Sequence, residues 1–204
     1  MELTYHGQSC IRLRGREMTV LVDPPQTALP GLAKGTVGII VRTDGVTDPA
    51  TLRPREGELQ EVCGPGEFEI GGVGIIGLAA GETTVMRIAV DDVRVVATGR
   101  LRRQLTEDEI DGLGHVDVLV VPVGGGDAVG VLDAAKLVHA IEPSVVVPAR
   151  FGTGDGGELD PVGKFAKEMG LVDGTWDPQP RLVLTGSTGE TDETRVVVLE
   201  ARSG

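Results

Sequence analysis

The chain has 204 residues, of which 40% are hydrophobic and 25% charged, so the composition excludes a wholly disordered protein and predicts a single folded domain over residues 1–204. Its 31 acidic and 19 basic side chains give a formal net charge of −12, which opposes nucleic-acid binding. The start of the chain lacks the pattern of a signal peptide, and no apolar run approaches the ~18 residues of a membrane span. We therefore expect a cytoplasmic protein with no membrane partner. Cys10 and Cys63 lack C-x-x-C spacing and are expected to be free thiols.

The first half of the chain predicts strands joined by tight turns. Short runs rich in Val, Ile and Thr are bordered by Gly, Pro or Asp, which is typical of strands. These runs cover residues 2–6, 9–14, 18–22, 37–41, 60–63, 68–70, 73–78, 84–90 and 93–98. Asp91 and Asp92 separate two apolar runs and predict a hairpin turn.

The second half alternates strands with helices. Thr106-x-x-Glu109 is a capping-box pattern that begins a short helix. The continuous apolar run at 116–121 predicts a strand covered on both faces. Further helices are expected at 131–141 and 161–169, and further strands at 144–147, 181–185 and 194–199. This order predicts an α/β fold with two sheets between helical layers.

Several segments, taken together, resemble one known family. GQSC at 7–10 is followed by LVDP at 21–24, then GPGEFEIGGV at 64–73 and VDVLVVPVGG at 116–125. In this order they resemble the motifs of metallo-β-lactamase-fold hydrolases, in the branch near the ascorbate-phosphate lactonases. The resemblance implies an αβ/βα four-layer sandwich with a metal site at one edge, between the two sheets.

That family holds one or two zinc or similar ions with imidazoles and carboxylates, and the ions activate a water molecule. The ligand positions that we could align correspond to these residues of this chain: Thr43, Gly45, Thr47, Asp48, Arg100 and Arg150. Glycine has no side chain to coordinate a metal, and a guanidinium is always protonated and repels one. We therefore expect no metal, no other cofactor and no catalytic residues at this site.

Arginines and carboxylates gather around the expected site: Asp23, Arg42, Asp44, Asp48, Arg100 and Arg150. One interpretation is that Arg–Asp pairs replace the metal–ligand bonds. Another is an arginine-lined pocket that binds a small anion, because guanidinium makes bidentate bonds to phosphate or carboxylate. A third is that these side chains lie in solvent. Arg102 and Arg103 add to a basic stretch that predicts a solvated loop or a contact for an acidic partner. The run from Gly124 to Asp127 predicts a turn after a strand.

The resulting hypothesis is a catalytically degenerate metallo-β-lactamase-fold protein. It would act as a binding, assembly or structural protein, associating with itself or with a protein partner. One alternative is a metal-dependent hydrolase with atypical ligands, namely Asp23, Asp44 and Asp48 with His6. Another is a sensor that binds a small anion in the arginine-lined pocket. Metal retained after purification favours the first alternative, and a melting screen with phosphorylated metabolites tests the second.

Overall fold

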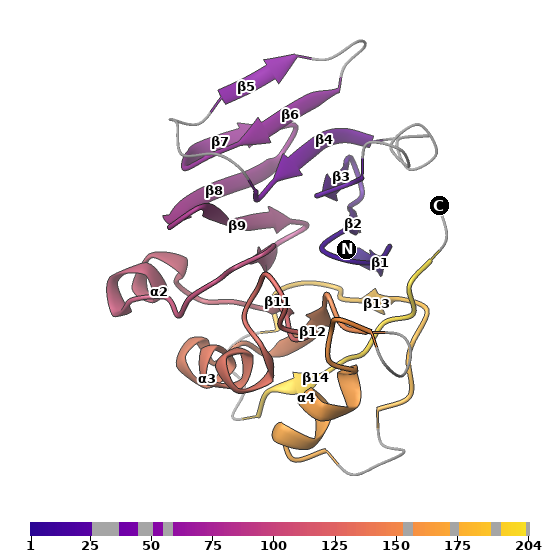
Figure 1. Cartoon of the computed structure of the whole chain (residues 1–204). Coiled ribbons are helices and arrows are strands. Elements are labelled where there is room, and N and C mark those ends of the chain that lie inside the picture. Colours follow the sequence, from indigo (N-terminus) through magenta and orange to yellow (C-terminus); the bar gives the residue numbers. More distant parts are fainter. Residues whose placement is uncertain are drawn as a thin grey trace.

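The computed structural model describes residues 1–25, 37–44, 51–54, 59–152, 157–171, 176–188 and 193–202, with only the backbone at 51–54. Within these residues two β-sheets pack face to face, and helices lie outside the second sheet (Figure 1). None of the helices described is long and apolar enough to cross a membrane.

The first sheet is built mainly from the N-terminal part of the chain. Its spatial order in the described residues is β13 (Leu182–Val183), β1 (Glu2–Tyr5), β2 (Ile11–Arg14), β3 (Thr19–Val22), β4 (Val37–Arg42), β6 (Gln60–Cys63) and β5 (Thr51–Pro54). The pairs β3–β4 and β4–β6 are parallel, and the other pairs are antiparallel. The edge strand β5 was not expected from the sequence, because its four residues include Pro54, and proline is uncommon in strands other than edge strands.

The second sheet follows in the chain. Its spatial order in the described residues is β14 (Arg195–Val196), β12 (Val145–Ala149), β11 (Val118–Pro122), β10 (Val93–Ala97), β9 (Thr83–Val90), β8 (Val73–Ala80) and β7 (Gly66–Ile70). The strands β10, β11, β12 and β14 run parallel, whereas β7 to β10 form an antiparallel meander. The carboxyl ends of β10, β11 and β12 therefore meet at one edge of the sheet.

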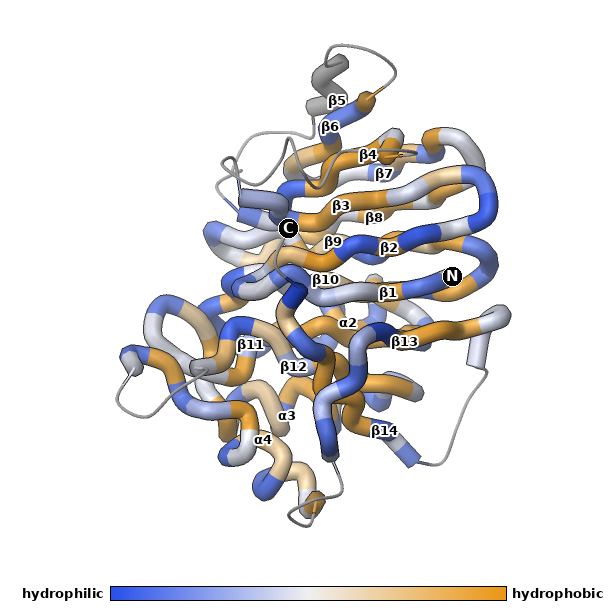
Figure 2. The backbone as a smooth tube through the Cα atoms, turned by 90° about the vertical axis from the view of Figure 1, so that its right-hand side faces the viewer, coloured by the Kyte–Doolittle hydropathy of each residue, from blue (hydrophilic) through white to orange (hydrophobic). Residues whose placement is uncertain are grey.

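Strand periodicity divides the apolar residues between two cores. Val95 belongs to the cluster between the two sheets, and the next residue, Val96, belongs to the cluster under the helices. Figure 2 shows mainly hydrophobic residues along β3 of the first sheet, whereas hydrophobic and hydrophilic residues alternate along β2. Because the second sheet has a core on each of its faces, the apolar run predicted at 116–121, which includes most of β11, is buried throughout.

The helices described are α2 (Glu107–Leu113), α3 (Val131–Ile141) and α4 (Val162–Glu168). Leu113, Leu137 and Phe165 are buried against the outer face of the second sheet. The capping box predicted before α2 is confirmed, since Thr106 Oγ1 accepts from Glu109 N and Glu109 Oε2 accepts from Thr106 N.

The hairpin predicted at Asp91 and Asp92 is confirmed as well. These residues join β9 to β10, and the flanking Val90 and Val93 pair directly. Both aspartates have positive φ, 50° and 65°, as a two-residue type I′ turn requires. Asp and Asn tolerate this conformation better than most residues, so the local sequence alone specified the turn.

Candidate functional site

Two parallel strands of the first sheet end side by side, and the residues after them are linked. Asp23 follows β3 and Thr43 follows β4. The Asp23 carboxylate accepts from Thr43 N at 2.8 Å and from Thr43 Oγ1. Burial raises the pKa of Asp23 to about 6, although the bonds from Thr43 act against this rise. Asp23 therefore acts as an internal acceptor that holds the end of β4.

Thr43 also joins the two sheets. Its carbonyl accepts from Thr84 N of β9 at 2.8 Å, and Asp44 forms an isolated bridge with Thr83. The fully buried Thr43 side chain lies against Gly99, where an added Cβ would stand 1.9 Å from Thr43 Oγ1. Gly99 also has a φ of +55°, so both the backbone conformation and the space require glycine at this position.

Arg100 follows Gly99 after β10 and makes two ion pairs. Its Nε contacts an Asp44 oxygen, and its Nη1 donates to Asp127 Oδ2 at 2.9 Å. The pairing with Asp44 ties the loop after β10 to the end of β4. Asp44 Oδ1 is buried and has no hydrogen-bond partner among the residues described.

Arg150 reaches the same carboxylate from a third loop, after β12. Its Nη2 donates to Asp127 Oδ1 at 2.5 Å, so each carboxylate oxygen of Asp127 accepts a hydrogen bond from a different guanidinium. Arg102 Nε adds a bond to the Asp127 carbonyl at 3.1 Å and pairs with Glu82 at 2.6 Å. We call Arg100, Arg102 and Arg150 around Asp127 the arginine cluster. It exists because β10, β11 and β12 are parallel neighbours whose following loops converge.

Asp127 is the centre of this cluster and is accessible. Its side chain is 47% exposed. Partial burial would raise the pKa of Asp127, but the charges of Arg150 and Arg100 outweigh this and hold the pKa below its ordinary value. Asp127 is therefore a fully ionised carboxylate at neutral pH, bound by guanidinium groups and open to solvent.

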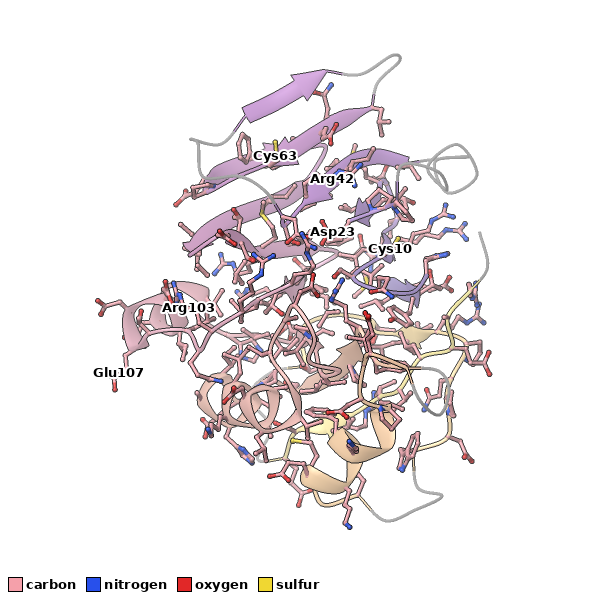
Figure 3. All side chains as sticks on the ribbon, viewed as in Figure 1. Cys10, Asp23, Arg42, Cys63, Arg103 and Glu107 are labelled. Atoms are coloured by element: carbon pink, nitrogen blue, oxygen red, sulfur yellow. The ribbon has the colours of Figure 1, made fainter. Side chains whose placement is uncertain are left out.

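Arg42 lies apart from the arginine cluster. Its Nε donates to Glu61 Oε1 at 3.0 Å, and its Nη1 donates to the Pro24 carbonyl at 2.5 Å. Figure 3 shows Arg42 near Asp23 and Cys10. The five described residues of the pocket predicted from the sequence are therefore divided between two groups. Asp23 and Arg42 lie at the ends of β3 and β4, Arg100 and Arg150 belong to the arginine cluster, and Asp44, the residue after Thr43, pairs with Arg100.

Three positions singled out from the sequence, Gly45, Thr47 and Asp48, lie outside the described residues. Arg103, from the basic stretch, pairs with Glu109 of α2 at 2.6 Å, and Figure 3 shows it beside that helix.

A pocket of about 640 Å³ opens beside the cluster. Its lining includes Tyr5, His6, Asp23 and Phe151. Tyr5 Oη accepts from Arg150 N at 3.3 Å, so the backbone that carries Arg150 forms part of the wall. Burial lowers the pKa of His6, whose Nδ1 has no hydrogen-bond partner in the part of the chain described. At neutral pH the imidazole is therefore an uncharged wall of this pocket.

The described residues do not fit a zinc centre. Among them there is no group of three or more His, Cys, Asp or Glu side chains placed to hold a metal. Asp44 and Asp127, two of the carboxylates that follow the strand ends, are each engaged by the Arg100 guanidinium. A cation would have to displace that positive charge before either carboxylate could bind it.

Asp127 was missed by sequence reasoning, which took it only as part of a turn. Local signals were weak, because an Asp after a glycine run is common in turns. Its role appears only when the loops after β10 and β12 bring Arg100 and Arg150 to it.

Comparisons with known proteins show the superfamily of this chain. A sequence model described as the beta-lactamase superfamily domain matches residues 2–150, most of the chain. The chain belongs to this superfamily. The superfamily resemblance suggested by the sequence motifs is thereby confirmed.

Relatives of this superfamily chain come from archaea and bacteria. It is 28% identical over 200 residues to a UPF0173 protein of Pyrococcus furiosus, covering 83% of this chain and 90% of the relative. Among solved structures, it is similar to an inferred Zn-dependent hydrolase of the metallo-β-lactamase superfamily from Thermotoga maritima, with a TM-score of 0.77, 23% identity and 98% of both chains covered. It is also similar to Igni18, a metallo hydrolase from Ignicoccus hospitalis, with a TM-score of 0.66, 17% identity, and 99% and 96% covered. These likenesses establish the metallo-β-lactamase fold that the sequence predicted.

Proposed function

We propose that this metallo-β-lactamase-fold chain works by binding, and that it binds a small anion at the arginine cluster. One observation carries the proposal: Arg100 and Arg150, from two different loops, converge on the two oxygens of one solvent-accessible carboxylate. The guanidinium fork matches carboxylate and phosphate oxygens, so groups arranged to hold an internal carboxylate can hold an external anion.

The proposal also includes the finer sequence inferences. Under this proposal the chain binds at the position where its relatives would hold a metal, and it is catalytically degenerate, as the motifs predicted. The placement near the ascorbate-phosphate lactonase branch stays a prediction from the motifs at 64–73 and 116–125. Self-association and a protein partner also stay predictions, which light scattering of the purified protein checks.

A second candidate is metal-dependent hydrolysis with atypical ligands. It is favoured by the descriptions of similar structures, an inferred Zn-dependent hydrolase from Thermotoga maritima and a metallo hydrolase from Ignicoccus hospitalis. Its ligands would have to include Asp44, which Arg100 already engages. Elemental analysis separates the two: about one zinc, manganese or iron per chain after purification without added metal would favour the hydrolase.

Calorimetric titration tests anion binding directly. We expect inorganic phosphate to bind the purified protein, and Arg100→Ala and Arg150→Ala each to weaken binding by about tenfold or more, since each removes a charge-assisted bond. Arg103→Ala is the matched control, because Arg103 is a neighbouring arginine that pairs with Glu109 instead. Binding that is absent, or equally weakened by all three substitutions, would contradict the proposed site.

A further inference from the structure

The loop that carries Asp127 has a defined shape. Gly125 and Gly126 have φ values of +75° and +69°, which glycine adopts at low cost. Val129 N donates to the Leu101 carbonyl at 2.8 Å, and this bond anchors the loop to the segment that carries Arg100. The turn thus holds the Asp127 carboxylate over the arginines, and it also ends one residue before the N-cap of α3, Gly130.

The carboxylate occupies the position that a bound anion needs. Each oxygen accepts from one guanidinium, at 2.9 Å from Arg100 and 2.5 Å from Arg150. A phosphate placed there would use the same two donors. With Asp127 in place, an incoming anion meets a negative charge and occupied donors, so Asp127 and the anion exclude each other.

Charge counting gives the same result. Arg100, Arg102 and Arg150 are matched by the carboxylates of Asp127, Asp44 and Glu82. Without Asp127 the cluster keeps an excess of one positive charge, and two guanidinium groups lose a partner. The half-exposed position of Asp127 allows its side chain to rotate into water, where a carboxylate is well solvated.

We propose that Asp127 is a built-in competitor that occupies the anion site and sets its affinity, so that only a strongly charged anion of the phosphate or phosphomonoester class displaces it. This inference rests on the proposed anion-binding function. A phosphate group carries a charge of about −1.5 to −2 at neutral pH and three acceptor oxygens, against one charge and two oxygens for Asp127. A simple carboxylate such as acetate has no such advantage and is excluded.

The test compares the wild-type chain with Asp127→Asn, which keeps the shape of the side chain and removes its charge. We expect inorganic phosphate to bind Asp127→Asn about tenfold more tightly, and acetate to bind only this variant, because the guanidinium groups are released. Asp133→Asn is the matched control, since Asp133 is an exposed carboxylate on α3 that pairs with Lys136. The control should bind phosphate as the wild type does.

A second measurement uses the wild-type chain alone and does not depend on the variant folding. Phosphate titrated into the ¹⁵N-labelled protein should shift the backbone amide signals of residues 126–128, because Asp127 leaves the arginines. Phosphate that binds the wild type without shifting these signals, or that binds Asp127→Asn no more tightly, would overturn the competitor role and leave anion binding standing. If neither protein binds phosphate, the proposed anion binding at the cluster is wrong, and so is the competitor role.

Discussion

Asp117 and Asp127 flank the same strand, β11, at its opposite ends, and they are held in different ways. Asp117 is fully buried and accepts from Arg94 N at 2.7 Å, from Ser187 Oγ at 2.7 Å and from Thr188 N at 2.7 Å. Asp127 is 47% exposed and is held through its carboxylate by guanidinium groups. One carboxylate is closed off from solvent, and the other is open to it.

This difference separates a structural role from a binding role. The donors to Asp117 are mainly backbone and hydroxyl groups, which would lose a fully buried acceptor without it. The side-chain donors to Asp127 are long charged groups that water or another anion can satisfy. Removing Asp117 should therefore cost stability, whereas removing Asp127 should change what the protein binds. Both predictions follow from burial more than from the number of bonds.

The largest expected effect is that of Asp117→Ala. The substitution leaves the amide groups of Arg94 and Thr188 without their acceptor and should lower the free energy of unfolding by about 3 kcal/mol. Urea denaturation followed by circular dichroism measures the loss. As a control, Asp133→Ala removes an exposed carboxylate from α3 and should cost less than about 0.5 kcal/mol. Equal losses for the two variants would show that Asp117 does not hold its end of β11.

A smaller loss is expected for Gly99→Ala, which tests the close approach beside the arginine cluster. The new Cβ would stand 1.9 Å from Thr43 Oγ1, at a residue with a φ of +55°. We compare it with Gly72→Ala, because Gly72 has a φ of +78° and nothing within 4 Å of an added Cβ. Gly72→Ala should cost about 1 kcal/mol from backbone strain alone, and Gly99→Ala about 2 kcal/mol in total because Thr43 must also move. Thermal melts that give similar losses would mean that Thr43 yields easily.

The smallest effect is expected for Asp127→Asn, and it should depend on pH. The pKa of Asp127 is lowered in the folded chain, so its ion pairs stabilise the fold above the ordinary carboxyl pKa of about 3.9. This contribution is lost as the pH falls through the lowered value. At pH 7 the wild type should exceed Asp127→Asn by less than about 1 kcal/mol, because the pairs are exposed. The difference should shrink in melts as the pH falls below the ordinary carboxyl pKa and toward the lowered pKa of Asp127. A stability difference between the wild type and Asp127→Asn that grows as the pH falls would contradict this prediction.

Much of the fold followed from the sequence. The hairpin at Asp91 and Asp92, the capping box before α2 and the buried run of β11 were all specified by neighbouring residues. The edge strand β5 could not be foreseen, since its pairing with β6 depends on the sheet to which it adds and not on its own composition.

The candidate site was predicted only in part. Arg100, Arg150 and Asp44 could be named from the resemblance, because they follow recognisable strands. Their partners could not be named. Arg42 pairs with Glu61, which the sequence analysis did not name as a partner, and Asp127 had been predicted only as part of a turn.

The sequence by itself determined the local elements and the superfamily resemblance, because both depend on residue type and on spacing along the chain. Only the tertiary structure decided which charges meet. Residues 44, 100, 127 and 150 are far apart in sequence, and they come together because Asp44 crosses from the first sheet while the loops after three parallel strands share one edge. Ion pairs form between whichever charged groups lie within a few ångströms of each other, and that distance is set by the packing of the two sheets.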